Sequence, residues 1–219
     1  YYENTIKQIS VLDLFFIKII QWFLLETNNK DLDNLLHSYS NSVYYDKSDI
    51  DYEAIYNLEK NNNIIIDKNP INSGTIAIVF KGIYDGKNVI IKTKRKYIKE
   101  KLSKSISLIK YISDILNLIP RFKIIKVSKI INDNTENLIK QIDFNKEKNN
   151  LKLFYDIYKN DNKIHTPFIY EELSNCDILI MEYFDGYKIN NYINRSNHYD
   201  IFENVYIFFL NSILNHNII

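Results

Sequence analysis

The spacing of apolar residues predicts helices in the first part of the chain. In residues 5–26 apolar side chains recur on one broad helical face, which is typical of a buried helix. A second, shorter helix is predicted over 30–39 and a third over 49–58. A polar break at 61–63 then leads into a short apolar run, 64–66, that starts or precedes the first strand.

A β-hairpin is predicted over residues 72–92. Small residues at 73–75 lead into a strand-like run that extends to Phe80. The pair Asp85-Gly86 supplies the tight turn that connects two antiparallel strands. The second strand ends on Lys92, directly after three apolar residues.

The rest of the chain is predicted to be helical, with two short strands before its last helix. Helices are predicted over 97–118, 127–158 (with a break near 132–134) and 201–214, and strands over 168–170 and 177–183. The order helices, hairpin, helices, strands, helix predicts an α+β fold in which the hairpin and the later strands form one antiparallel sheet.

The charge balance carries no signature of nucleic-acid binding. The chain has 28 Lys and Arg against 27 Asp and Glu, a net charge of +1. Its one basic cluster, 92–96, is expected to be a solvated strand end followed by the start of a helix. Polar and charged residues interrupt the most apolar stretch, 11–25, so no transmembrane segment is predicted.

The scarce residue types narrow the chemistry. Cys176 is the only cysteine, which excludes an intramolecular disulfide and favours a reducing, intracellular compartment. The four histidines have no metal-ligand spacing, so no metal site is predicted. Met181 is the only methionine, and the chain is therefore expected to be a fragment or a processed form.

The hairpin carries residue types that bind nucleotide phosphates. A lysine at the end of an apolar strand can neutralise phosphate oxygens, as the strand lysine of protein kinases does. Lys92 occupies this position, and backbone N–H groups of Ser73, Gly74 and Thr75 could cover the phosphates. Glu147, on a predicted helix, is a candidate to orient the lysine amine, although a glutamate on a helix more often faces solvent. A surface lysine and an ordinary β-turn remain as the alternatives.

Four blocks of sequence follow one another along the chain. They cover residues 16–22 (Phe-Ile-Lys-Ile-Ile-Gln-Trp), 70–77 with 89–92, 141–150, and 167–186, which ends Ile-Leu-Ile-Met-Glu-Tyr-Phe-Asp-Gly. In this order and spacing the blocks resemble the motifs of the UbiB/AarF/ADCK family of atypical, protein-kinase-like kinases. The first block is similar to the family's Lys-x-Gly-Gln motif and the third to its Glu-x-Asp motif.

The resemblance implies roles for two polar motifs. Lys18 and Gln21 lie one helical turn apart, and the resemblance implies that Lys18 points at the nucleotide pocket and meets Asp143 there. This helix would restrict access by protein substrates. Ile20 replaces the glycine of the first motif, and Gln141 replaces the glutamate of the second.

Two further expectations concern the neighbours of these motifs. Asp143 and Glu147 are four residues apart in a predicted helix and are expected on one face of it. Glu182 and Tyr183 follow a buried strand, and the resemblance implies that their backbone groups form the hinge that binds adenine.

The resemblance also implies a domain organisation and an activity. Residues 1–60 would form an N-terminal helical extension, 61–186 a kinase-like small lobe with inserted helices, and 187–219 the start of a helical large lobe. The full-length protein would bind Mg²⁺ and ATP and transfer or hydrolyse the γ-phosphate, with the catalytic aspartate and metal ligands in motifs that the family has after residue 219.

The resemblance links the family to ubiquinone and lipid metabolism, so a lipid or quinone-like molecule is a candidate partner, and so is peripheral contact with a membrane. Two other functions remain open. The protein could be a pseudokinase that acts as a nucleotide-binding regulatory module, or a helix-rich scaffold without a ligand.

Overall fold

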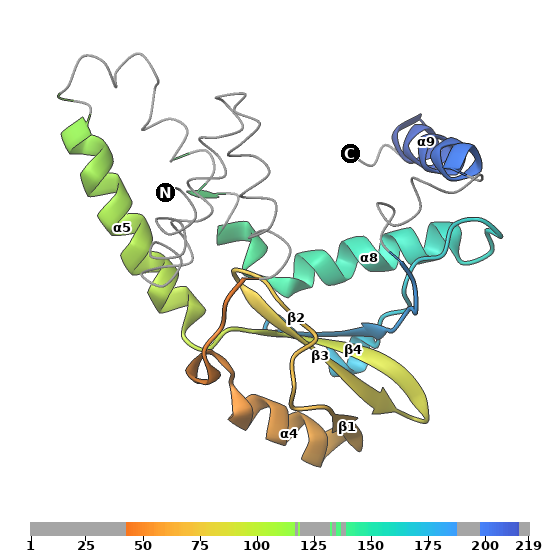
Figure 1. Ribbon diagram of the computed structural model, residues 1–219, viewed down its shortest axis with the longest axis horizontal. Helices are drawn as coiled ribbons and strands as arrows, with labels where there is room; N and C mark the ends of the chain where they lie inside the picture. Colours follow the sequence, from red (N-terminus) through yellow and green to blue (C-terminus); the bar gives the residue numbers. More distant parts are fainter. Residues whose placement is uncertain are drawn as a thin grey trace.

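A five-stranded antiparallel sheet lies at the centre of the described part of the chain (Figure 1). The structure is a computed structural model that describes residues 43–116, 139–187 and 198–214, with 118, 132, 135 and 136. The strands are β1 (Ile64–Ile66), β2 (Asn72–Ser73), β3 (Ala77–Tyr84), β4 (Lys87–Lys94) and β5 (Ile178–Glu182). They lie in the order β1-β3-β4-β5, and β2 also pairs with β3. The predicted α+β fold with one antiparallel sheet is confirmed.

Strands β3 and β4 form the predicted hairpin. At its turn Asp85 and Gly86 have φ angles of 49° and 71°. This left-handed conformation at both positions is what a two-residue hairpin turn requires. At the other end Ala77 lies opposite Lys94. The register therefore brings the end of β4 next to the loop 72–76 that precedes β3.

The alternation of side chains along the strands produces a core on each face of the sheet. One core packs against α4 (Tyr52–Asn62), and the other packs against the start of α8 (Phe144–Tyr158); the two helices lie on opposite sides of the sheet in Figure 1. The first core contains Ile55, Leu58, Ile78, Phe80, Val89, Ile91 and Ile180, and the second contains Ala77, Phe144, Ile169 and Leu179. Each fully buried side chain of this size contributes roughly 1.5–3 kcal/mol.

Helix α4 begins later than the sequence suggested. The predicted helix over 49–58 is wrong at its start, because the chain first makes a short 3₁₀ turn at Lys47–Asp49. Asp51 then caps α4 by accepting a hydrogen bond from the backbone N–H of Ala54. The 3₁₀ turn and α4 have separate N-caps, Asp46 and Asp51, so Asp49 does not cap α4.

In the helical zone predicted over 127–158, the structure gives the bounds of one helix, α8, which covers the last part of the zone. Helix α8 begins at Phe144, and Asp143 is its N-cap, with an extended backbone and a side chain that accepts from the N–H of Asn145 at 3.0 Å. The prediction that Asp143 and Glu147 share a helical face is therefore wrong. An aspartate that bonds the first turn ends the preceding segment and starts a new helix.

The strand predicted over 168–170 is wrong. Its residues form only an isolated bridge, between Ile169 and Met181 of β5, and a 3₁₀ turn follows at Glu171–Leu173. The strand predicted over 177–183 is β5. Two backbone bonds keep the bridge segment at the edge of the sheet: Tyr170 N–H to the Ile180 carbonyl and Glu182 N–H to the Phe168 carbonyl.

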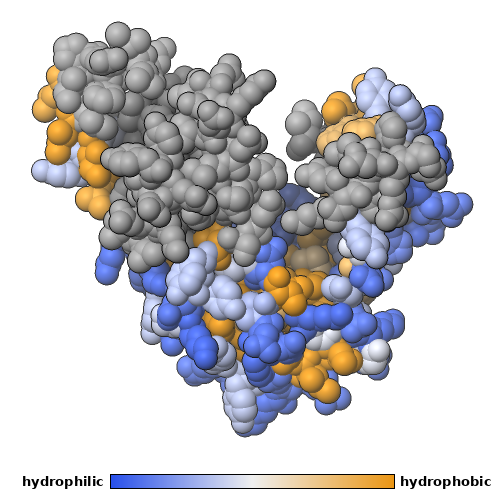
Figure 2. All heavy atoms as spheres, in the orientation of Figure 1, coloured by the Kyte–Doolittle hydropathy of each residue, from blue (hydrophilic) through white to orange (hydrophobic). Residues whose placement is uncertain are grey.

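Two further helices complete the described part. The predicted helix over 97–118 is α5 (Ile98–Leu116), and that over 201–214 is α9 (His198–Leu214). Large hydrophobic side chains are exposed on both helices, including Tyr111 and Phe209. Figure 2 shows hydrophobic residues, in orange, at the surface of the molecule. None of the described helices is both long and apolar enough to cross a membrane. The helices predicted over 5–26 and 30–39 lie outside the described residues.

Two glycines provide a matched test of backbone packing. A Cβ atom at Gly82 would lie 2.6 Å from the Ile65 carbonyl oxygen and 2.7 Å from Ile91 Cδ1, whereas one at Gly74 would lie 3.7 Å from the Ala77 carbonyl oxygen. We expect Gly82→Ala to lower the free energy of unfolding by about 1–3 kcal/mol. Gly74→Ala should change it by less than about 0.5 kcal/mol. Urea denaturation of both variants measures this, and equal losses would contradict it.

Candidate functional site

The site is built around an ion pair between β4 and α8. The Nζ atom of Lys92 lies 2.7 Å from Oε1 and 2.6 Å from Oε2 of Glu147, so one amine bonds both carboxylate oxygens. The two side chains are 25% and 38% exposed, which leaves the amine within reach of a ligand. The predicted pairing of Lys92 with Glu147 is confirmed.

Local features at the start of α8 determine this geometry. The Phe144 N–H donates to the Cys176 carbonyl at 3.1 Å and so fixes the helix start beside β5. The Phe144 ring is buried in the second core, and the amine of Lys92 lies 4.9 Å from its centroid. Glu147 follows three residues later, within the first turn, and meets Lys92. The position of the helix start beside β5 and the burial of Phe144 thus bring Glu147 to Lys92.

A cavity of about 350 Å³ lies between this ion pair and the loop that precedes β3. The predicted site residues that line it are Ser73, Gly74, Thr75, Lys92, Gln141 and Glu147. The structure therefore brings together residues separated by more than 70 positions. Gln141 joins them from the segment just before α8.

The loop 73–75 offers fewer free donors than predicted. The N–H of Ser73 donates to the Asn72 side chain at 2.8 Å, and the N–H of Gly74 donates to the Ala77 carbonyl at 2.8 Å. Both bonds close the turn locally, so these groups already have acceptors. Within the described residues Thr75 donates no backbone hydrogen bond. Of these three backbone N–H groups, only that of Thr75 has no hydrogen-bond acceptor among the described residues.

The predicted hinge residues lie apart from this cavity. Glu182 and Tyr183, at the end of β5, do not line it. Their N–H groups already donate, to the Phe168 carbonyl at 2.8 Å and to the Asn88 carbonyl at 3.2 Å. The sequence could not indicate this, because the acceptors belong to an edge segment and to a neighbouring strand.

The motif residues are distributed differently from the prediction. Asp143 caps α8 and faces a neighbouring cavity of about 610 Å³, together with Ile142 and Lys99. Lys18 and Gln21 lie outside the described residues, so the predicted contact of Lys18 with Asp143 stays a prediction.

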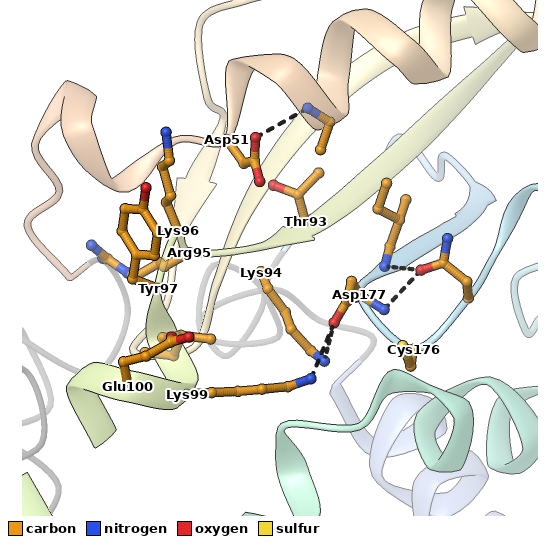
Figure 3. Close-up of a pocket in the computed structure, with 14 residues that line it drawn as sticks. Asp51, Thr93, Lys94, Arg95, Lys96, Tyr97, Lys99, Glu100, Cys176 and Asp177 are labelled. Carbon is orange, nitrogen blue, oxygen red and sulfur yellow. Dashed lines mark hydrogen bonds and ion pairs between the residues drawn. The ribbon is translucent and has the colours of Figure 1, made fainter. Parts of the chain in front are cut away.

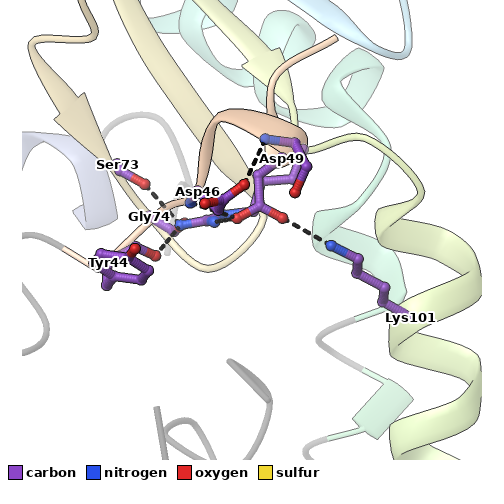
Figure 4. A network of polar contacts seen from close by, with 8 residues as sticks. Tyr44, Asp46, Asp49, Ser73, Gly74 and Lys101 are labelled. Atoms are coloured by element: carbon purple, nitrogen blue, oxygen red, sulfur yellow. Dashed lines mark hydrogen bonds and ion pairs between the residues drawn. The ribbon is translucent and has the colours of Figure 1, made fainter. Parts of the chain in front are cut away.

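The expectation that the basic cluster 92–96 is solvated is wrong for Lys94 and Arg95, which are buried. Arg95 is 2% exposed, and its guanidinium bonds four groups (Figure 4). The acceptors are Asp49 Oδ2 at 2.7 Å, Ser73 Oγ at 2.7 Å, the Gly74 carbonyl at 2.9 Å and the Tyr44 carbonyl at 3.0 Å. Burial lowers the pKa of Arg95, and Asp49 opposes this effect. An arginine among lysines gives no local sign of burial, which is why sequence analysis missed it.

Asp49 is the acidic centre of this network. Its Oδ1 accepts from Lys101 of α5 at 2.7 Å, and its Oδ2 also accepts from the N–H of Asp46 at 3.1 Å. Burial by itself would raise the pKa of Asp49, but these hydrogen bonds and the charges of Arg95 and Lys101 lower it overall. The carboxylate is therefore held in its ionised form.

Lys94 is likewise buried and paired. Its amine lies 2.6 Å from Asp177, which Lys99 approaches at 3.9 Å (Figure 3). The hydrogen bond from Lys94 lowers the pKa of Asp177 against the effect of burial. These residues line a cavity of about 570 Å³ with the half-buried Cys176. Charges of both signs occur there, so the cavity has no clear preference for an anion.

No group of three His, Cys, Asp or Glu side chains is placed to hold a metal ion among the residues that the structure describes.

The sequence matches a known family over most of its length. The profile of the ABC1 atypical kinase-like domain matches residues 60–219. This chain belongs to that family. The predicted resemblance to the AarF-type kinases is confirmed. The block at 16–22 lies before the matched residues.

Curated relatives support the same assignment. The chain is 29% identical over 198 residues to an uncharacterised protein in the hydrogenase 1 5′ region of Clostridium pasteurianum, covering 86% of this chain and 37% of the relative. It is 27% identical over 134 residues to AarF domain-containing protein kinase 1 of Xenopus laevis, covering 59% and 25%. It is 27% identical over 126 residues to the chloroplastic protein ACTIVITY OF BC1 COMPLEX KINASE 1 of Arabidopsis thaliana, covering 54% and 18%. The chain spans less than two fifths of the length of these relatives.

Removal of the Asp49 charge should make stability less sensitive to acid. Because the folded pKa of Asp49 lies below the unfolded value near 3.9, its contribution is present above about pH 5 and is lost as the pH falls through the folded pKa. Asp49→Asn leaves Arg95 buried without its counter-charge, which should cost about 3 kcal/mol at pH 7. The difference from wild type should shrink below about pH 4.

Urea denaturation between pH 3 and pH 7 measures this effect. Asp156→Asn is the matched control, because Asp156 is 53% exposed and its ion pair with Lys159 lies on the surface of α8. That variant should unfold like wild type at every pH. A constant difference between Asp49→Asn and wild type down to pH 3 would contradict the prediction.

Proposed function

We infer that this kinase-like domain binds the phosphates of a nucleoside triphosphate, with ATP as the specific candidate. The observation that carries this proposal is the ion pair of Lys92 with both oxygens of Glu147 on the wall of a cavity that the loop 73–75 also lines. Protein kinases hold a nucleotide with the same parts: a strand lysine, a helical glutamate and a loop over the phosphates.

Each residue has a defined task in this proposal. Glu147 fixes the position of the Lys92 amine, and the amine neutralises phosphate oxygens as a compact positive charge. The N–H of Thr75 donates from the loop. If adenine binds near Glu182 and Tyr183, their carbonyl groups are the available contacts, because their N–H groups are engaged.

We propose that the full-length protein transfers or hydrolyses the γ-phosphate. In such reactions catalysis consists mainly of positioning and of charge stabilisation, and Mg²⁺ bridges the phosphate oxygens and neutralises their developing charge. The described residues would orient the phosphates through Lys92 and Thr75. The word kinase in the names of the Xenopus and Arabidopsis relatives supports this proposal.

The division of the chain is also a proposal. The family match begins at residue 60, which supports a boundary between an N-terminal extension, 1–60, and a small lobe, 61–186. Residues 187–219 would begin the large lobe. Lys18 and Gln21 of the extension would lie across the site, with Lys18 pointing at the nucleotide pocket and meeting Asp143. A lipid or quinone-like molecule remains the candidate partner.

A second candidate is a pseudokinase that binds nucleotide without turnover. Gln141 favours it, because an amide at this cavity-lining position keeps hydrogen bonding and lacks the charge of the family's glutamate. Both candidates require nucleotide binding, and they differ in the release of ADP.

Titration of the full-length protein with Mg²⁺ and a fluorescent ATP analogue tests the shared step. Lys92→Met should weaken binding by at least roughly tenfold, the size expected for a lost hydrogen bond to a charged group. Lys94→Met is the matched control, because Lys94 lies two residues along β4, also faces the Phe144 ring, and pairs with Asp177. It should bind within about twofold of wild type.

Equal binding by wild type and Lys92→Met would overturn the proposed role of Lys92, and absence of binding by both proteins would favour a scaffold without a ligand. Where wild type binds, release of ADP separates the two candidates. Turnover that Lys92→Met abolishes supports the kinase or ATPase, and binding without turnover supports the regulatory module.

A further inference from the structure

Arg95 hydrogen-bonds three residues of the loop that lines the cavity beside Lys92. The backbone N–H of Arg95 donates to the Ile76 carbonyl at 2.9 Å. Its Nε donates to the Gly74 carbonyl at 2.9 Å, and its Nη2 donates to Ser73 Oγ at 2.7 Å. Three members of the loop therefore have the same partner, and two of them are bonded by its side chain.

The orientation of the guanidinium is itself fixed. Its Nη1 donates to Asp49 at 2.7 Å, and its Nη2 also donates to the Tyr44 carbonyl at 3.0 Å (Figure 4). A planar fork of donors can bond several acceptors at once, whereas a lysine amine at this depth is a single point. The site thus requires arginine for its geometry as well as for its charge.

These contacts join the loop to a segment outside the family match. Asp49 and Tyr44 lie before residue 60, where the matched domain begins. In addition, the N–H of Val43 donates to the Ser73 carbonyl at 2.8 Å. Residues 43–50 and Arg95 therefore hold the loop from two sides, and the conformation of the loop depends on both.

We propose that Arg95 is a positioning residue for the nucleotide's phosphates: anchored by Asp49, it holds the loop 73–76 over the cavity beside Lys92. This inference rests on the proposed function, since it concerns the same site. It adds that phosphate affinity depends on a buried residue that touches no ligand and on a segment that precedes the kinase-like domain. A residue with this role alters affinity for phosphate groups and leaves affinity for the nucleoside unchanged.

The test compares ATP with adenosine on the full-length protein. Each competes with a fluorescent ATP analogue, well below the melting temperature of every variant. Arg95→Lys keeps a positive charge near Asp49 and cannot make the fork of bonds to the loop. This variant should bind ATP roughly tenfold more weakly than wild type, the size expected when one or two hydrogen bonds from a charged donor are lost. Its affinity for adenosine should equal that of wild type.

Lys101→Met is the matched control. Lys101 bonds the same Asp49 carboxylate, but its side chain is 51% exposed and makes no bond to the loop. This variant should keep the wild-type affinity for ATP. If Arg95→Lys fails to fold, Ser73→Ala is tested instead, because this substitution removes one hydrogen bond between Arg95 and the loop. Ser73→Ala should weaken the binding of ATP by about threefold.

Amide hydrogen exchange supplies a second readout without nucleotide. The Gly74 N–H, bonded to the Ala77 carbonyl, should exchange faster in Arg95→Lys than in wild type or Lys101→Met. Wild-type affinity for ATP in Arg95→Lys, equal losses of ATP and adenosine affinity, or unchanged exchange would overturn this inference. Lys92→Met separates the two failures: if it binds ATP like wild type, the proposed role of Lys92 fails, and if neither protein binds ATP, the proposed function itself fails.

Discussion

The contact on which the site depends is the ion pair between Lys92 and Glu147. It joins a strand to a helix that covers the sheet, across 55 positions of sequence. Both side chains are partly exposed, so water screens the attraction and the gain in stability is small. Its consequence is positional: two short bonds hold the amine on the wall of the cavity.

The second ion pair of the site has the opposite character. Arg95 and Asp49 are buried, and their charges are tolerated because they pair with each other and because the guanidinium donates further hydrogen bonds to Ser73, Gly74 and Tyr44. Arginine suits this place because its donors form a rigid fork, and lysine suits the cavity wall because its amine is a compact point charge. One pair bonds the protein's own loop, and the other lies on the wall of the cavity.

Family membership and contact geometry contribute different parts of this picture. The match over 60–219 assigns the kinase-like domain, and it does not say which groups are free to bind. The hydrogen bonds make that distinction. The N–H groups of Ser73 and Gly74 have acceptors, whereas that of Thr75 has none among the described residues. The hydrogen bonds also show that Asp143 is the N-cap of α8 and does not lie on a face of the helix, as was predicted.

The sequence by itself determined the hairpin, through the Asp85-Gly86 turn and the strand-like runs around it, and it indicated the family and the pairing of Lys92 with Glu147. These features follow from short-range periodicity and from motif order. Only the tertiary structure decided where α8 begins, how the segment 168–170 meets β5, and that Arg95 is buried. Each of these depends on which distant group satisfies a hydrogen bond, as when Arg95 reaches Asp49 across 46 positions, and periodicity along the chain contains no information about such partners.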